Sequence, residues 1–346
     1  MPLCQSRGAG GSGLWQDDAT RSARPALCYR GNIMPDQTPA ATRYLVILNQ
    51  GAGTIRSRGV ETVRASIGKG LSGSGAVDIR SVDGDGIDAL VDDVLASGSA
   101  DIIVVVGGGD GTVAAVAGKL AGTEVALAVL PLGTMNMVSQ SAGFSQNLEQ
   151  AVAQIASGQI KPVDVGRVNG RVFLHQVSFG LQPRVVRIRE RIGYNSRLTK
   201  MLSGTVAMLA VLSRPRPVRM VGEFDGRLIR LKLTALFVSN NLYRIDRPRI
   251  PVQMDGGELG IYMVKAWRWR DYVRLVLAAL RGTWQDDAMV DVQAVKALRL
   301  NVRRKASHGK QLASIDGELA YLESPIDIVS DHLALRLVMP PEAAKA

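Results

Sequence analysis

Cysteine, histidine and aromatic residues are scarce in this chain of 346 residues. The two cysteines, Cys4 and Cys28, both precede residue 30, which excludes a disulfide framework and a thiolate metal site in the rest of the chain. The three histidines are scattered and predict no metal cluster. Aromatic residues make up only 5% of the chain, whereas single-strand nucleic-acid binders stack bases on aromatic residues interleaved with basic ones. We therefore expect no nucleic-acid partner.

Long hydrophobic runs are also missing. The longest, from Met201 to Leu212, is too short to span a bilayer. Residues 1–42 are rich in Gly, Ser, Ala and Pro and lack the apolar stretch of a signal peptide, so they predict a disordered leader. We expect a cytoplasmic protein that associates peripherally with the membrane.

Positive charge, by contrast, is in excess, with a formal net charge of +11. Such a balance predicts an acidic partner. With nucleic acid set aside, the candidates are an anionic membrane surface and the polyphosphate of a nucleotide. The sequence leaves open whether the chain forms a homo-oligomer.

A glycine turn organises the chain. The apolar run 102–106 predicts a buried strand, the segment Gly107-Gly108-Gly109-Asp110-Gly111-Thr112 follows, and apolar residues then recur at helical spacing. Such a turn presents backbone N–H groups to an anion at a helix N-terminus. Asp110 would repel a phosphate unless a metal ion or a substrate hydroxyl lies between them, which favours phosphoryl transfer. Thr112 breaks the dinucleotide-binding fingerprint, and a plain strand–helix connection is the alternative.

Strands and helices alternate through the first half of the sequence. This alternation predicts a parallel sheet with helices on both faces, a Rossmann-like three-layer α/β domain. The predicted strands end in the loops 49–54, 107–112 and 131–136, which should converge at the carboxyl edge of the sheet. The second half predicts an antiparallel β domain with helices at about 184–213 and 268–281. Its strands are expected at 163–168, 171–177, 220–224, 228–238, 260–264, 295–302, 314–315 and 326–329.

Several motifs together resemble one family. The chain is similar to the diacylglycerol kinase catalytic-domain family, which includes bacterial lipid kinases and the sphingosine and ceramide kinases, from about residue 43 to residue 340. The motifs that carry the resemblance are Gly108-Gly109-Asp110-Gly111-Thr112, Pro131-Leu132-Gly133-Thr134-Met135-Asn136, Val163-Asp164-Val165-Gly166, Ser178-Phe179-Gly180 and Ile315-Asp316-Gly317-Glu318.

The resemblance implies an ATP-dependent kinase that phosphorylates a lipid hydroxyl, such as that of diacylglycerol or a sphingoid base, with Mg²⁺. It implies an α/β nucleotide domain, assigned to 43–162, followed by an antiparallel β-sandwich domain, assigned to 163–330, with ATP between them. By the same resemblance the C-terminal segment 331–346 is expected to return to the first domain.

The expected site residues fall into two groups. Those expected to bind the nucleotide are Asn49, Ser81, Gly108, Gly109, Asp110, Gly111, Thr112, Gly133, Thr134 and Asn136, with Ser81 assigned by resemblance alone. By resemblance Glu318 is the base for the lipid hydroxyl, with Asp316 and Asp110 in support. Asp316 and Glu318 are two apart, so on a strand both would face the same way. The alternative is a hairpin turn at Asp316-Gly317 followed by a solvated glutamate. No metal ligand is assigned.

Three positions depart from the family pattern. Gln50 stands where proline is usual, Met137 where aspartate is common, and Gly256 where a turn usually has a second aspartate. They keep two alternatives open: an NAD or nucleotide kinase, and a lipid- or nucleotide-binding regulator without turnover.

The segment 268–281 predicts a basic amphipathic helix. Trp267 and Trp269 lie among arginines at its start, and leucines and valines follow. This pattern is expected of a helix that rests on anionic lipid. The alternative is a helix whose apolar side packs on the core.

Overall fold

The computed structural model describes residues 42–99, 101–192, 217–243, 253–302 and 310–341. All but the last residue of the predicted leader lies outside these ranges, as does the part of the predicted 184–213 helix beyond Ile192. Within the described ranges, no helix combines the length and the apolar character needed to cross a bilayer.

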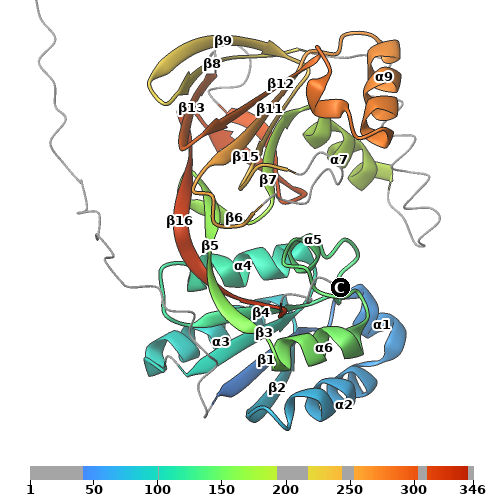
Figure 1. The fold of residues 1–346 in the computed structure, drawn as a ribbon, viewed down its shortest axis with the longest axis vertical. Helices are drawn as coiled ribbons and strands as arrows, with labels where there is room; N and C mark the ends of the chain where they lie inside the picture. The colour runs from blue at the N-terminus through green and yellow to red at the C-terminus, as the bar shows by residue number, and fades with distance from the viewer. Residues whose placement is uncertain (1–41, 100, 193–216, 244–252, 303–309, 342–346) are drawn as a thin grey trace, which may run out of the picture. The chain divides into compact units, whose positions relative to one another are not determined.

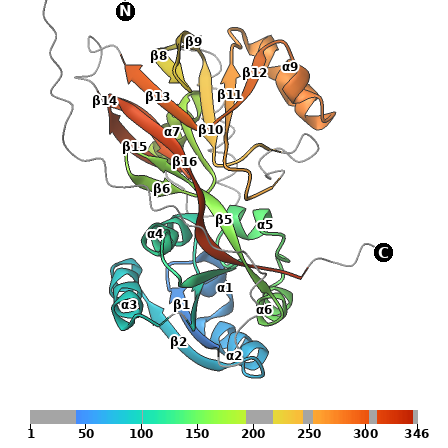
Figure 2. The same ribbon diagram turned by 60° about the vertical axis from the view of Figure 1, so that its left-hand side comes forward.

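The first half of the described chain alternates strands and helices, as predicted. Its elements are β1 (Arg43–Asn49), α1 (Gly53–Arg58), α2 (Val60–Leu71), β2 (Ala76–Val82), α3 (Gly84–Ser97), β3 (Ile102–Gly107), α4 (Asp110–Leu120), β4 (Ala126–Leu130), α5 (Met137–Ser141) and α6 (Leu148–Ala156). The strands pair in parallel in the order β2-β1-β3-β4. Helices α3 and α4 lie on one face and α1, α2 and α6 on the other (Figures 1 and 2). Both β3 and β4 are buried throughout because helices exclude water from both faces.

This strand order creates a switch point between β1 and β3. From β1 the chain moves outward to β2, and it then returns to the other side of β1 to form β3 and β4. The chain therefore leaves β1 and β3 toward opposite faces, and sheets of this kind bind ligands at the carboxyl edge of such a switch point.

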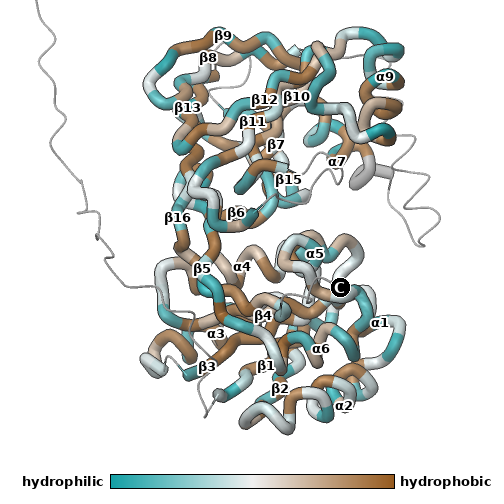
Figure 3. The backbone as a smooth tube through the Cα atoms, in the orientation of Figure 1, coloured by the Kyte–Doolittle hydropathy of each residue, from teal (hydrophilic) through white to brown (hydrophobic). Residues whose placement is uncertain are grey.

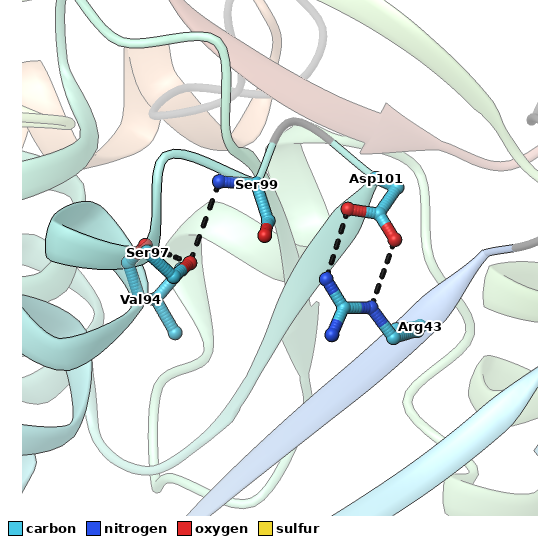
Figure 4. Close-up of polar contacts among 5 residues, drawn as sticks. All are labelled: Arg43, Val94, Ser97, Ser99 and Asp101. Atoms are coloured by element: carbon cyan, nitrogen blue, oxygen red, sulfur yellow. Dashed lines mark hydrogen bonds and ion pairs between the residues drawn. The ribbon is translucent and has the colours of Figure 1, made fainter.

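At the opposite, amino edge an ion pair joins the same two strands (Figure 4). Arg43 Nε lies 2.8 Å from Asp101 Oδ2, so the first residue of β1 is tied to the residue that precedes β3. Nearby, α3 ends with Ser97 Oγ donating to the carbonyl of Val94, and Ser97 Oγ accepts from the Ser99 N–H. Since the ion pair is largely solvent-exposed, it contributes little energy and mainly favours the observed register.

The second half is built mostly of antiparallel strands. Its elements are β5 (Gln159–Val168), β6 (Arg171–Phe173), β7 (Gln176–Gly180), α7 (Leu181–Ile192), β8 (Val218–Phe224), β9 (Arg227–Leu233), β10 (Ala235–Ser239), β11 (Leu259–Val264), α9 (Trp269–Leu280), the 3₁₀ helix η1 (Trp284–Asp286), β12 (Val290–Val295), β13 (Ala297–Val302), β14 (Lys310–Ile315), β15 (Glu318–Glu323) and β16 (Ile326–Met339). A six-stranded sheet, β12-β11-β10-β7-β14-β15, shares one apolar core with strands of a second sheet. The predicted fold class, α/β followed by an antiparallel β-sandwich, is confirmed.

Two expected strands are each two strands. The stretch 171–177 breaks into β6 and β7, and 228–238 divides at Thr234, where the chain passes from one sheet to the other. The expected strand 295–302 is β13, and it follows β12 across a similar break at Lys296; of β12 only Val295 was expected. Apolar residues continue through each break because both sheets face the same core, so the pattern alone does not reveal the crossing. Strand β15 was not predicted.

Strand β16 joins the two halves in one sheet. It pairs with β13 and along most of its length with β5, and near its end Leu337 pairs in parallel with Leu127 of β4. The result is a continuous ten-stranded sheet. Residues 335–339 thus lie beside strands of the α/β half.

A buried carboxylate accepts hydrogen bonds at the point where β16 is irregular. The register of β16 shifts between Asp331 and Leu335. There Asp164 of β5 is fully buried, and its oxygens accept from the N–H groups of Leu333 at 2.9 Å and Gly257 at 2.6 Å. His332 Nδ1 lies 2.7 Å from the same carboxylate. Asp164 therefore links β5, β16 and the turn before β11.

We expect Asp164→Ala to lower the free energy of unfolding by about 2–4 kcal/mol, because it leaves buried N–H groups without an acceptor. Chemical denaturation measures this change. The control is Asp327→Ala, which removes a half-exposed carboxylate paired with Arg299 and should cost less than about 1 kcal/mol. Equal losses in the two variants would contradict the structural role given to Asp164.

Candidate active site

The glycine turn after β3 has little room for side chains. A Cβ on Gly107 would lie 2.6 Å from Leu132 Cδ1, and one on Gly108 would lie 2.8 Å from Thr112 Cβ. Gly109 is extended and precedes the first turn of α4, which begins at Asp110. The backbone can therefore present the N-terminus of α4, with its partial positive charge, to an anion at close range.

Hydrogen bonds hold the three predicted loops together at the carboxyl edge. Asn49 Nδ2 donates to Thr112 Oγ1 at 2.9 Å, which joins the loop after β1 to the glycine turn. The Thr54 N–H donates to the carbonyl of Leu132 at 3.2 Å, which joins the first loop to the third. The structure thus brings loops 49–54, 107–112 and 131–136 to one place.

The third loop lies directly against the glycine turn. A Cβ on Gly133 would come within 3.0 Å of the Gly108 carbonyl oxygen, so a side chain there would separate the loops. Asn136 has a left-handed backbone with φ of 50°, and its Nδ2 donates to Gln146 Oε1. Thr134 is exposed. That these residues bind a nucleotide remains a prediction.

Ser81 lies near the end of β2, beside the first loop. Its carbonyl accepts from Gln50 Nε2 at 3.3 Å, and its hydroxyl has no hydrogen-bond partner among the described residues. Strand β1 therefore lies between the strand that carries Ser81 and the strand that leads into the glycine turn.

Asp110 connects the glycine turn to the third loop. Its Oδ1 accepts from the Met137 N–H at 2.7 Å, at the start of α5. Burial raises the pKa of Asp110, while backbone N–H groups of residues 136–138 act in the opposite direction. Part of the hydrogen-bonding capacity of this carboxylate is thus used to fix a loop.

The expected shared direction of Asp316 and Glu318 is wrong, because Asp316 is not on a strand. It lies in the two-residue turn between β14 and β15, with φ of 47°, and Gly317 follows with φ of 95°. These are the left-handed conformations of a tight hairpin turn. The Asp316 carboxylate turns back and accepts from the N–H groups of residues 174, 175 and 176 at 2.8 to 2.9 Å. These bonds also explain the break between β6 and β7.

Glu318, the first residue of β15, approaches helix α4. Its Oε1 occupies space that a Cβ on Gly111 would need, and its Oε2 lies 3.1 Å from Arg171 Nη2. The side chain remains 57% exposed, unlike Asp316 and Asp110. Of the three predicted acids, Glu318 therefore has its carboxylate both at the α4 N-terminus and open to solvent.

A cavity of about 450 Å³ adjoins Glu318. Small residues of α4 form one side, the β5–β6 hairpin forms another, and the β14–β15 turn closes one end. Its lining includes Gly111, Ala114, Ala115, Gly118, Arg171, Val172, Asp316 and Glu318. The exposed carboxylate thus faces a space between the two halves of the chain.

Sequence reasoning missed Arg171. The Asn169-Gly170 turn signal correctly placed it at the start of a strand, but no local pattern connects it with a glutamate 147 residues later. Only the meeting of the β5–β6 and β14–β15 hairpins brings the two charges together.

Known proteins are similar to this chain in sequence and in fold. The family model of the diacylglycerol kinase catalytic domain matches residues 43–168. A protein of Pseudomonas syringae pv. tomato named "Probable lipid kinase YegS-like" is 31% identical over 66% of this chain and 72% of its own. The diacylglycerol kinase of Bacillus subtilis is 24% identical over 70% of this chain and 79% of its own. The crystal structure of a diacylglycerol kinase from Bacillus anthracis superposes with a TM-score of 0.62 at 22% identity, covering 86% of this chain and 97% of that one.

These similarities, together with an α/β domain that carries a glycine turn, identify the chain as a lipid kinase. The chain belongs to the diacylglycerol kinase catalytic-domain family.

We expect Gly111→Ala to lower the lipid phosphorylation rate by about 10²-fold, because the added methyl group displaces the Glu318 carboxylate. Stability should be unchanged or slightly higher, since alanine favours a helix more than glycine does. Rate assays and thermal denaturation measure the two effects. Gly68→Ala is the matched control, because its Cβ makes only an ordinary contact at 3.8 Å with Ile79. A Gly111→Ala variant with the wild-type rate would contradict the proximity of Glu318.

The pH dependence of stability tests the environment of Asp316. Burial raises its pKa from 3.8 to about 6, so the folded chain binds this proton more tightly than the unfolded chain does. The group therefore favours folding at low pH, and its contribution, at most about 3 kcal/mol, is lost as the pH rises from about 4 to about 6. The difference in unfolding free energy between wild type and Asp316→Asn should fall over that range and level off above it. A constant difference would contradict the raised pKa.

Proposed function

We propose that this lipid kinase uses ATP, with Mg²⁺, to phosphorylate a hydroxyl group of a lipid such as diacylglycerol or a sphingoid base. The observation that carries the proposal is the Glu318 carboxylate, held against Gly111 at the N-terminus of α4 and exposed to the adjoining cavity. A phosphate at this helix terminus would have a base beside it. The Bacillus subtilis relative, named for diacylglycerol, favours that lipid as the acceptor.

The glycine turn would hold the phosphates. Backbone N–H groups of residues 108–112 bind phosphate oxygens at close range, and the hydroxyl groups of Thr112 and Thr134 add further donors. Asn49 donates to the Thr112 hydroxyl, and Asn136 in the third loop, whose amide donates to Gln146, would offer that amide to the nucleotide. This arrangement supplies the positioning on which phosphoryl transfer mainly depends.

The three acids have different roles. Glu318 accepts the proton of the lipid hydroxyl as that oxygen attacks the γ-phosphorus of ATP, and the bond from this phosphorus to the bridging oxygen breaks to release ADP. Asp316 fixes the turn that carries Glu318, and Asp110 fixes the third loop against the glycine turn. Asp316 is therefore a positioning residue, and the proton transfer is left to Glu318.

Mg²⁺ is compatible with the acids at the glycine turn. The described residues contain no cluster of three side chains suited to hold a metal ion. Mg²⁺ at kinase sites usually takes one or two carboxylates together with phosphates and water, so such a cluster is not required. Asp110 is the carboxylate that would hold it. When bound, the ion neutralises charge on the transferred phosphoryl group.

A lipid acceptor and the positive net charge of the chain both favour a reaction at a membrane surface. We propose that the enzyme is cytoplasmic and binds an anionic membrane surface peripherally, where acceptor lipids are concentrated.

We expect Glu318→Gln to lower the transfer of labelled γ-phosphate from ATP into a total lipid extract by at least about 10²-fold, because the amide cannot accept the hydroxyl proton. Nucleotide binding should persist. Glu323→Gln is the matched control, because it removes an exposed charge at the other end of β15, where Glu323 pairs with Lys310. Identification of the labelled lipid would name the acceptor.

Other outcomes would overturn the proposal. A Glu318→Gln variant as active as wild type would exclude Glu318 as the base. Phosphorylation of NAD without any labelled lipid would show a nucleotide kinase. ATP binding without any phosphorylated product would show a regulator.

A further inference from the structure

Helix α9 carries an apolar face that the described parts of the chain do not cover. Five large apolar side chains of this helix are between 42% and 80% exposed: Trp269, Val273, Val276, Leu277 and Leu280. Helix α9 is attached to the sandwich by other residues, of which Tyr272 and Ala278 are buried. The alternative, in which the apolar side packs on the core, is therefore wrong for these five residues, which we call the α9 face.

The α9 face is a continuous stripe rather than a scatter. Trp269, Val273, Val276 and Leu280 follow one another at intervals of three and four residues, so they lie above one another on the helix. Four exposed arginines accompany the stripe: Arg268, Arg270, Arg274 and Arg281. Figure 3 shows hydrophobic and hydrophilic segments along this one helix. A helix with an exposed apolar stripe beside basic residues is suited to lie in a membrane interface.

The start of the helix is held firmly in place. The Asp271 carboxylate accepts from the N–H groups of Trp267 and Arg268, both at 2.8 Å, which caps the first turn. The ammonium group of Lys232, at the end of β9, lies 5.3 Å from the centre of the Trp267 ring. Because these contacts are already made, binding would require little ordering of the start of α9 or of the Trp267 ring.

We infer that the α9 face docks on an anionic membrane surface and inserts its apolar side chains among the lipid headgroups. The inference deepens the proposed function, because a kinase of membrane lipids needs such a contact. A second copy of the chain fits less well: in a two-fold dimer through this face, arginines would meet arginines. Anionic headgroups instead complement both the arginines and the net charge of +11.

Sedimentation of the full chain with vesicles tests this docking. Vesicles of phosphatidylcholine with phosphatidylglycerol should bind the chain more tightly than vesicles of phosphatidylcholine alone, and salt should weaken the binding. The double variant Val276→Ser/Leu280→Ser should bind at least about tenfold more weakly, since two apolar side chains no longer leave water. Both positions are more than half exposed, so the fold should be retained. Val329→Ser, which changes an exposed valine of β16, is the control and should bind as wild type does.

A second variant tests the charge. Arg270→Gln/Arg281→Gln should weaken binding to the phosphatidylglycerol vesicles several-fold and reduce its dependence on salt. Unchanged vesicle binding by both double variants would overturn the inference. Light scattering provides a further check: a wild-type dimer that Val276→Ser/Leu280→Ser converts to a monomer, with vesicle binding unchanged, would assign the face to a second copy.

The test separates this inference from the proposed kinase activity, because sedimentation requires no ATP turnover. Suppose that the α9 variants lose vesicle binding and that the chain phosphorylates no lipid. The first result would support the docking face, and the second would refute only the kinase proposal. In an active enzyme, the α9 variants should phosphorylate a short-chain acceptor in detergent at the wild-type rate and lose at least about tenfold on an acceptor embedded in vesicles. Equal activity of wild type and variants on both acceptors would contradict a role for docking.

Discussion

The close approach of one hairpin to one helix terminus is the constraint on which this structure depends. The Glu318 carboxylate can occupy the N-terminus of α4 only because Gly111 has no side chain there. The same requirement extends along the turn, where Gly107 and Gly108 allow the neighbouring loops to pack on bare backbone. A glycine turn thus does two things in this chain: it exposes N–H groups to an anion, and it admits an acid from a distant part of the sequence.

The backbone ladder of one sheet sets the distance between the two halves. Strands β5 and β16 run from the sandwich to the parallel strands, and the β5–β6 hairpin that carries Arg171 belongs to this sheet. The β14–β15 hairpin that carries Glu318 belongs to the six-stranded sheet, and Asp316 ties it to the connection between β6 and β7. Buried acids secure the irregular points of that framework. Asp164 satisfies donors where β16 changes register, and Asp316 satisfies three N–H groups where β6 and β7 separate. Burying these carboxylates is costly, and the backbone donors offset the cost.

Two kinds of group are exposed in this molecule, one acidic and one apolar. Asp110 and Asp316 accept hydrogen bonds from loop N–H groups, whereas the Glu318 carboxylate remains in contact with water and with a cavity. At α9 the exposure is apolar, with two valines, two leucines and a tryptophan exposed to water beside arginines. Exposed apolar surface of this kind is unfavourable in a soluble state and becomes favourable when a lipid interface covers it.

The sequence by itself determined the fold class and the family. Apolar periodicity separated an α/β half from an antiparallel half, and the motifs at 108–112, 131–136 and 315–318 indicated a lipid kinase, because these patterns depend on local spacing. Only the tertiary structure decided what each acid does: Asp316 turned out to lie in a turn, Arg171 paired with a residue 147 positions away, and the apolar side of α9 was left uncovered. Such outcomes depend on which strands become neighbours and on which surfaces find a partner, and neither is written in the spacing of nearby residues.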